Sequence, residues 1–202
     1  MSDHYFTESP TVASSPAEVD VRIWGHRLSL TTDAGVFARG RVDTGTALLF
    51  RCVEPPAGGT LLDLGCGYGV IACLLAAAAP TSQVWAVDVN ERAVDLTGAN
   101  ARRLGVDDRV HARPPAQVPA DLRFDAIWSN PPIRIGKTAL HTLLLDWLPR
   151  LSPNGIAHLV VARHLGADSL QAWLTQQGYP CTRVGAAKGF RVLAARPARS
   201  SR

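Results

Sequence analysis

The segment that most constrains the fold is LLDLGCGYGV, residues 61–70 of this 202-residue chain. Its first four residues are typical of a strand buried on both faces of a parallel sheet. Glycines follow at every second position, and the apolar run from Val70 to Ala79 predicts a buried helix that is too short to cross a bilayer. Glycine suits such a turn because the backbone bends tightly and a ligand can approach where a Cβ would clash. The segment therefore predicts a strand, a binding loop and a helix.

The glycine spacing and the preceding acid indicate the kind of ligand. A dinucleotide loop has the pattern G-x-G-x-x-G, which places pyrophosphate on the helix N-terminus. Here Gly69 comes one residue early, and Val70 occupies the third position of that pattern. Asp63 would repel a phosphate, but its carboxylate can accept hydrogen bonds from an ammonium group. The loop therefore favours S-adenosylmethionine, which has a cationic amino-acid end and no phosphate, over NAD.

A second acid, Asp88, ends the next strand-like run, VWAVDV, one strand–helix unit later. A carboxylate at that place can accept both ribose hydroxyls. The alternative interpretation of the glycine segment is a plain turn, and that of Asp88 is a structural carboxylate. Because the two motifs occur together, each makes the alternative interpretation of the other less favourable. The cofactor site predicted from this half of the chain comprises Asp63, Gly65, Cys66, Gly67, Gly69, Asp88 and Val89.

Strand and helix patterns alternate through the remaining chain, which predicts a doubly wound α/β sheet. Strands are expected at residues 109–113, 124–129, 156–162, 181–184 and 191–195. Helices are expected at residues 91–104, capped by Asn90, at 139–148, and at 169–177, opened by Asp168. Before the glycine loop, VDVRIWGHRLSL predicts a β-hairpin turning at Gly25-His26, and ALLFRCV predicts a short helix. The expected parts are an N-terminal extension (1–50), the main domain (51–197) and a flexible tail (198–202).

The chemistry is expected at Asn130-Pro131-Pro132-Ile133, which follows the fourth strand of the expected sheet. Ligands of open α/β sheets bind outside the carboxyl ends of the strands, so this tetrapeptide should lie beside the glycine loop. An aryl amine is a poor nucleophile because its lone pair is delocalised into the ring. The Asn130 side-chain oxygen and the Pro131 carbonyl can accept its two N–H groups and orient the lone pair. A Pro-Pro turn that only ends a strand is the alternative interpretation.

Taken together, DLGCGYG, Asp88 and NPPI resemble the class I methyltransferase "small domain" family, from about Phe37 to the end of the last strand. That family includes ribosomal-RNA guanine-N2 methyltransferases, and the chain is similar to its archaeal and actinobacterial single-domain members. The resemblance implies a Rossmann-like fold with a seven-stranded, mostly parallel sheet. It implies that Asp63 and the three glycines bind the methionine end of the cofactor, and that Asp88 binds the ribose. It also implies that a segment from Val36 to Thr46 closes over the cofactor.

Two positions depart from the family pattern. The family usually has an aromatic residue after the two prolines to stack the target base, whereas Ile133 offers only apolar contact. A Gly-Asp pair commonly follows the third strand and binds the adenine amine. Here that region reads Arg113-Pro114-Pro115-Ala116, so adenine recognition must depend on other groups.

Cationic residues beyond the NPPI motif are candidates for substrate binding. The formal net charge is +4, which mildly favours a polyanionic partner. The candidates for holding phosphates beside a flipped nucleotide, with an aromatic side chain to stack, are Arg134, Lys137, Lys188, Phe190 and Arg191. A solvated charged rim is the alternative interpretation.

The remaining features narrow the expected setting. The cysteines at 52, 66, 73 and 181 have no C-x-x-C spacing, so neither a zinc site nor a disulfide framework is expected. The polar start has no secretory pattern, and we expect a cytoplasmic protein without a metal or a membrane partner. The predicted activity is N-methylation of a nucleic-acid base by S-adenosylmethionine, with S-adenosylhomocysteine as product and guanine N2 of ribosomal RNA as the favoured target. A protein glutamine, a small-molecule amine, or a non-catalytic cofactor- or RNA-binding role remain the alternatives.

Overall fold

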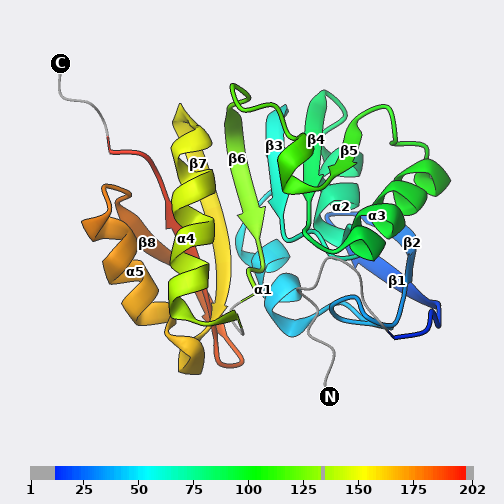
Figure 1. Ribbon diagram of the computed structural model, residues 1–202, viewed down its shortest axis with the longest axis horizontal. Helices are drawn as coiled ribbons and strands as arrows, with labels where there is room; N and C mark the ends of the chain where they lie inside the picture. The colour runs from blue at the N-terminus through cyan, green and yellow to red at the C-terminus, as the bar shows by residue number, and fades with distance from the viewer. Residues whose placement is uncertain (1–11, 133–134, 199–202) are drawn as a thin grey trace.

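The computed structural model describes residues 12–132 and 135–198. Its centre is one seven-stranded sheet (Figure 1). The strand order is β5-β4-β3-β6-β7-β9-β8. All strands run parallel except β9, which is antiparallel to both of its neighbours. The strands are β3 (Gly59–Leu64), β4 (Ser82–Val87), β5 (Val110–Arg113), β6 (Phe124–Ser129), β7 (Leu151–Ala162), β8 (Cys181–Ala187) and β9 (Phe190–Ala195). The predicted doubly wound, mostly parallel sheet is confirmed.

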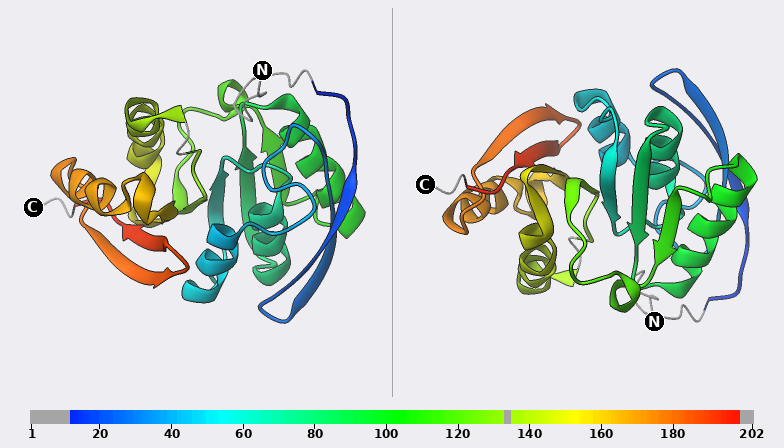
Figure 2. Two further views of the ribbon diagram at one scale, coloured as in Figure 1. Left: turned by 90° about the horizontal axis from the view of Figure 1, so that it is seen from below. Right: turned by 90° about the horizontal axis from the view of Figure 1, so that it is seen from above.

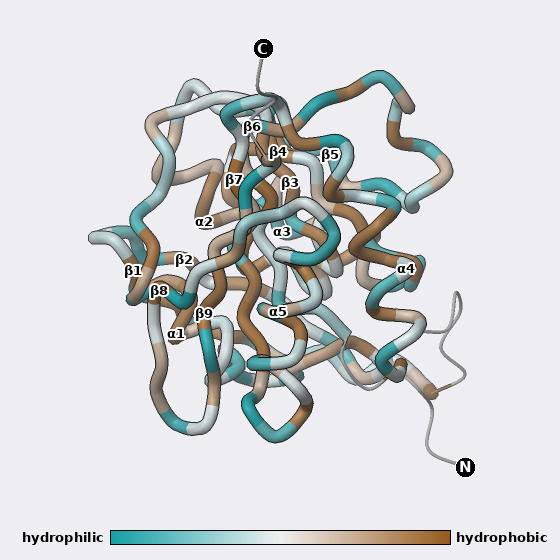
Figure 3. The backbone as a smooth tube through the Cα atoms, turned by 90° about the vertical axis from the view of Figure 1, so that its left-hand side faces the viewer, coloured by the Kyte–Doolittle hydropathy of each residue, from teal (hydrophilic) through white to brown (hydrophobic). Residues whose placement is uncertain are grey.

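Helices cover both faces of this sheet, because its strands carry apolar side chains on each side. Leu61, Val84 and Trp128 belong to the core on one face, beneath α1, α2 and α3, and Leu62, Ile127 and Leu159 belong to the core beneath α4 and α5. The tube view shows the strands as mainly hydrophobic segments through the middle of the molecule (Figure 3). The helices are α1 (Thr44–Cys52), α2 (Val70–Ala78), α3 (Glu91–Leu104), α4 (Lys137–Trp147) and α5 (Ala167–Gln176).

The predicted N-terminal hairpin is confirmed as a separate two-stranded sheet of β1 (Ala17–Ile23) and β2 (His26–Thr32). It lies along α2 and α3, on the side of these helices away from the sheet (Figure 2). Asn100 of α3 fixes it there, since its side chain accepts from the Thr31 amide at 2.8 Å and donates to the Thr31 carbonyl at 2.8 Å. The Asn100 side-chain amide also donates to the Tyr68 carbonyl at 2.9 Å, which connects the hairpin to the glycine loop.

Several predicted boundaries need correction. The helix α5 starts at Ala167 with Gly166 as its N-cap, so Asp168 lies in the first turn and does not open the helix. The last two strands were expected at 181–184 and 191–195, but β8 continues to Ala187 and β9 begins at Phe190, so only Lys188-Gly189 connects them. The helix α1 begins at Thr44, earlier than the apolar run indicates, because the Asp43 side chain accepts from the Gly45 and Thr46 amides.

Some of the predicted site and tail residues lie outside the part of the chain that the structure describes. Ile133 and Arg134 lie outside the described part of the chain, as does most of the predicted tail. Within residues 12–132 and 135–198, no helix is both long and apolar enough to span a bilayer.

Candidate active site

The glycine loop and the Asn130 segment meet at the carboxyl edge of the sheet, where the strand order reverses. They follow β3 and β6, which are paired in parallel. The Ser129 hydroxyl donates to the Leu64 carbonyl at 2.6 Å, which fixes the end of one strand against the other. A Cβ placed on Gly65 would come within 3.8 Å of the Pro132 ring. The expected neighbourhood of the two motifs is therefore present.

Gly69 is the position in the loop where glycine is required. Its φ is 84°, and it is the N-cap of α2. A Cβ at Gly69 would lie 2.8 Å from two side-chain atoms of Thr97 on α3. The Thr97 hydroxyl in turn donates to the Gly67 carbonyl at 3.1 Å, so α3 packs directly beneath the loop. Both the backbone conformation and this close packing exclude a larger residue.

Asp63 lies beneath the loop and is fully buried. Its Oδ2 atom accepts from the Ala72 amide in the first turn of α2 at 3.0 Å, whereas its Oδ1 atom has no partner within the described residues. Burial raises the pKa of this carboxyl to about 8, and the neighbouring Asp88 adds to the increase. An unpaired buried carboxylate oxygen is costly. A cationic group bound above the loop would stabilise the ionised form.

Asp88 follows β4 and binds the loop from the other side. Its two carboxylate oxygens accept from the Gly67 amide at 2.9 Å and from the Asn90 amide at 3.0 Å. Burial raises the pKa of Asp88 as well. Val89, the next residue, is 42% exposed and borders the open side of this region. Two carboxyl groups with raised pKa values therefore flank one glycine loop.

A small cavity of about 20 Å³ lies over the loop. Phe37 and Ala38 border it on one side, and the Tyr68 hydroxyl ties the covering segment to the loop by donating to the Arg41 carbonyl at 3.1 Å. The described residues that line it come from the covering segment, α1, the glycine loop, α2 and the β6 end: Phe37, Ala38, Asp43, Thr46, Gly65, Cys66, Gly67, Tyr68, Val70, Ile71 and Asn130. Residues from the two predicted motifs and from the predicted covering segment thus share one cavity.

The Asn130 side chain is held from the start of α1. Its Nδ2 atom donates to Asp43 Oδ2 at 2.9 Å and to Thr46 Oγ1 at 3.0 Å. Thr46, which was expected to contact the cofactor, therefore lies against Asn130 at the same cavity. Asp43 was not recognised from the sequence. An acid followed by Gly-Thr and an apolar run is an N-cap signal that points to it.

The predicted substrate-binding residues are divided between two places. The Phe190 ring packs against Gly45, because a Cβ at Gly45 would lie 3.1 Å from that ring. Phe190 therefore lies beside Asp43 and Thr46, at the carboxyl end of β7, where it pairs with Ala162. Lys188 is exposed at the hairpin turn, with a φ of 48°.

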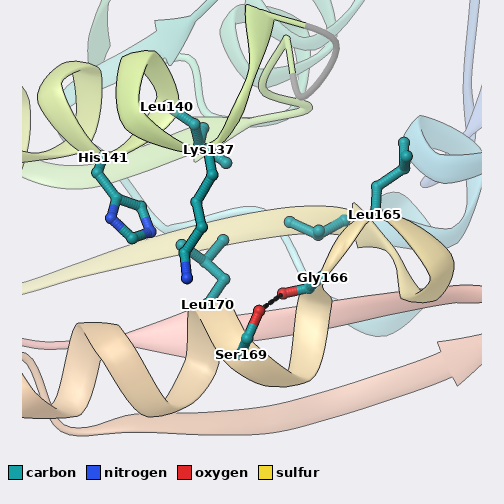
Figure 4. A pocket seen from close by; sticks show the side chains of 8 residues that line it. Lys137, Leu140, His141, Leu165, Gly166, Ser169 and Leu170 are labelled. Atoms are coloured by element: carbon teal, nitrogen blue, oxygen red, sulfur yellow. Dashed lines mark hydrogen bonds between the residues drawn. The ribbon is translucent and has the colours of Figure 1, made fainter.

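Lys137 and Arg191 lie further along the same edge. Lys137 borders a second cavity of about 170 Å³, whose lining includes the apolar residues Leu140, Val161 and Leu170. Figure 4 shows this cavity from close by. The close-up shows the Lys137 amine reaching across this cavity from α4 towards α5. Arg191 is paired with Asp168 at 3.5 Å, and only 18% of its side chain is exposed. Lys137 and Lys188 are therefore more accessible to a polyanion than Arg191.

Comparison with known proteins identifies the class to which this fold and site belong. Residues 27–194 match the family model described as "Methyltransferase small domain". The chain belongs to this family of methyltransferases, which use S-adenosylmethionine.

Three similar proteins mark its place in the family. The chain is 33% identical to "Uncharacterized protein YbxB" of Bacillus subtilis over 97% of this chain and 99% of that protein. It is 32% identical to "Ribosomal RNA small subunit methyltransferase C" of Pseudomonas aeruginosa over 92% of this chain, but only 58% of that protein. The T. thermophilus 16S rRNA N2 G1207 methyltransferase (RsmC), solved in complex with AdoMet and guanosine, has a TM-score of 0.79 at 23% identity. That match covers 93% of this chain and 52% of the T. thermophilus chain, so the ribosomal RNA methyltransferases contain a large additional part.

Proposed function

We propose that this chain transfers the methyl group of S-adenosylmethionine to an exocyclic amine of a base in ribosomal RNA, with guanine N2 as the target. The observation that carries the proposal is the Asn130 amide. It lies at the cavity over the glycine loop, with its Nδ2 atom held by Asp43 and Thr46. The amide oxygen is thereby left to accept from an amine placed beside the cofactor loop.

The cofactor half of the site suits a ligand with a cationic end and a ribose. Asp63, directly before the glycine loop, has a buried Oδ1 atom with no partner among the described residues, and the ammonium end would bind near this carboxyl group. Asp88 and the exposed Val89 lie where the ribose and the adenine would extend from the small cavity along the open edge. When bound, S-adenosylmethionine supplies a methyl group activated by the sulfonium. No phosphate-binding helix terminus is needed, because S-adenosylmethionine has no phosphate.

The residues that follow β6 would act on the acceptor. Asn130 Oδ1 and the Pro131 carbonyl would accept the two N–H groups of the amine and direct its lone pair at the methyl group. Proline fixes the backbone before the substrate arrives. No strong base is required, because the amine can release its proton to solvent after methylation. Pro132 and Ile133 would supply apolar contact to the base, and Phe190 is available beside Asp43 and Thr46 to stack on it.

Two observations support RNA as the substrate. Relatives of the chain are ribosomal RNA methyltransferases, and accessible cationic side chains lie on the side where the acceptor would bind. Lys137 and Lys188 are exposed there and Arg134 follows the NPPI motif, so they would hold phosphates around the target nucleotide. A cytoplasmic location follows from an RNA substrate of the ribosome. A protein glutamine or a small-molecule amine would use the same amide acceptor, and the experiment must separate these acceptors.

Nucleoside mass spectrometry separates them. Deleting the gene should remove one methylated guanosine from ribosomal RNA, and the wild-type gene should restore it whereas an Asn130→Ala gene should not. An unchanged nucleoside profile together with loss of a methylated glutamine would replace RNA with a protein acceptor. Absence of any change in methylation would count against the enzymatic proposal.

A further inference from the structure

We propose that Asp43, acting with Thr46, is the positioning residue of the acceptor site: it holds the Asn130 amide in the one orientation that presents Oδ1 to the substrate amine. This inference rests on the proposed function and adds to it the residue that orients the acceptor group. It connects two loops that are 87 residues apart in the sequence.

The first step of the argument is that the Asp43 carboxylate determines which way the amide faces. An amide group has a donor end and an acceptor end of nearly the same shape, so its neighbours decide the orientation. A carboxylate can only accept, and Asp43 Oδ2 lies 2.9 Å from the side-chain terminus of Asn130. The NH₂ end must therefore face Asp43. The flipped amide would direct its oxygen at the carboxylate, and the two would repel each other.

The second step is that both N–H groups of Asn130 are used. One is directed to Asp43 Oδ2, and the other to Thr46 Oγ1 at 3.0 Å. No described residue donates to Asn130 Oδ1, so this oxygen keeps its accepting capacity. An amide that donates to an anion also carries more negative charge on its oxygen, because hydrogen bonds in a chain polarise one another. Asp43 would thus strengthen the acceptor as well as orient it.

The third step is that Asp43 is itself immobilised. The same Oδ2 atom accepts from the Gly45 amide at 2.7 Å and from the Thr46 amide at 3.3 Å, as the N-cap of α1. Gly45 is required in this turn, since a Cβ there would lie 2.9 Å from Asp43 Oδ2 and 3.1 Å from the Phe190 ring. The helix terminus, the carboxylate and the aromatic ring form one packed support behind Asn130.

The test separates orientation of the amide from a general structural role. Asp43→Ser and Asp43→Asn both keep a good N-cap, so the fold and α1 should survive. Either change removes the anionic acceptor and should lower kcat about 10-fold or more, with an unchanged KM for ribosomal RNA and unchanged affinity for S-adenosylhomocysteine. Thr46→Val removes the second acceptor at nearly the same volume and should have a smaller effect of the same kind. The assay is transfer of isotopically labelled methyl groups to ribosomal RNA from a strain that lacks the gene.

A double-mutant cycle with Asn130→Ala supplies the decisive readout. If Asp43 acts through Asn130, Asp43→Ser should cost little further rate once Asn130 is already Ala. Additive losses would mean that Asp43 supports the site independently of the amide, and would overturn the inference.

A second readout requires no substrate. In ¹⁵N-labelled protein, the side-chain amide resonances of Asn130 should shift strongly in Asp43→Ser, and unchanged resonances would also overturn the inference. Inactive wild-type protein would refute the proposed function, whereas an active wild type with fully active Asp43 variants would refute only the role of Asp43.

Discussion

The region around the glycine loop and the region beyond Asn130 differ in how exposed their charged side chains are. Around the glycine loop, Asp88 accepts from two backbone amides, and Asn100 connects the glycine loop to the N-terminal hairpin. Beyond it, the Asn130 amide is held by Asp43, whereas Lys137 and Lys188 are exposed. On the proposed function, the buried or half-buried carboxyl groups around the glycine loop would bind the methyl donor, and the exposed lysines would bind the acceptor.

The largest expected effect on the rate comes from the Asn130 amide, which lies between the glycine loop and the proposed acceptor. Asn130→Ala should lower kcat about 100-fold or more, because it removes a preorganised polar contact at the reacting centre. Affinity for S-adenosylhomocysteine, measured by calorimetry, should change by less than about a factor of two. Asn154→Ala, at an exposed position near the start of β7, is the matched control and should retain full activity. Loss of cofactor binding at an unchanged rate in saturating cofactor would make Asn130 a structural residue.

The second prediction concerns pH and tests the region around the glycine loop. The folded protein holds a proton on Asp63, whose pKa is about 8, whereas the unfolded chain releases it near the ordinary value of 3.8. The free energy of unfolding should therefore fall as pH rises between those values, by at most about 1.4 kcal/mol per unit, and level off above pH 8. Burial raises the pKa of Asp88 too, which acts in the same direction.

Urea denaturation of the ligand-free protein from pH 5 to 9 measures this dependence. Asp63→Asn should flatten it, while Asp20→Asn, at a carboxylate that is 62% exposed, should not. Because a cationic ligand favours the ionised carboxyl, affinity for S-adenosylhomocysteine should rise over the same pH range. If the wild type and Asp63→Asn showed the same slope, Asp63 would not carry the buried proton.

Asp88→Ala should have the third-largest effect. It leaves the Gly67 amide without its acceptor and removes the proposed ribose contact, so S-adenosylhomocysteine should bind about 1–3 kcal/mol more weakly. Calorimetry measures this loss. The wild type should bind no NADH, and binding of NADH in preference to S-adenosylhomocysteine would contradict the assignment of the loop.

The smallest expected effect tests the region beyond Asn130. Removing two charges with Lys137→Gln and Lys188→Gln should flatten the log–log dependence of RNA affinity on salt by about 1.5, at 0.7–0.9 for each phosphate contact. Arg191→Gln should change the slope less, because Asp168 already pairs with this guanidinium. Fluorescence anisotropy with a ribosomal RNA fragment measures these slopes. An unaltered slope in the double variant would exclude both lysines from the RNA surface.

The sequence predicted the surroundings of the glycine loop better than those of Asn130 for a physical reason. The glycines, the buried strand before them and the acid at the next strand end are local patterns, and parallel sheet topology brings them to one edge. The hydrogen bond between Asp43 and Asn130 depends on the packing of α1 against the sheet. The sequence around either residue alone therefore does not predict it. The partner of Arg191 was missed for the same reason, since Asp168 lies on a different element. The position of a charged residue in the sequence does not show whether its side chain is already in an ion pair.

Labelled methyl transfer by the purified protein tests the central claim most directly. The protein is incubated with S-adenosylmethionine carrying a deuterated methyl group and with ribosomal RNA from a strain that lacks the gene, and the RNA is then digested to nucleosides. The account predicts deuterated N2-methylguanosine in the wild-type reaction and about 100-fold less with Asn130→Ala. Label in another nucleoside would correct the base, and label in a protein glutamine would move the acceptor to protein. No label in any acceptor, from protein that binds S-adenosylhomocysteine, would contradict the claim that this site transfers methyl groups to an amine.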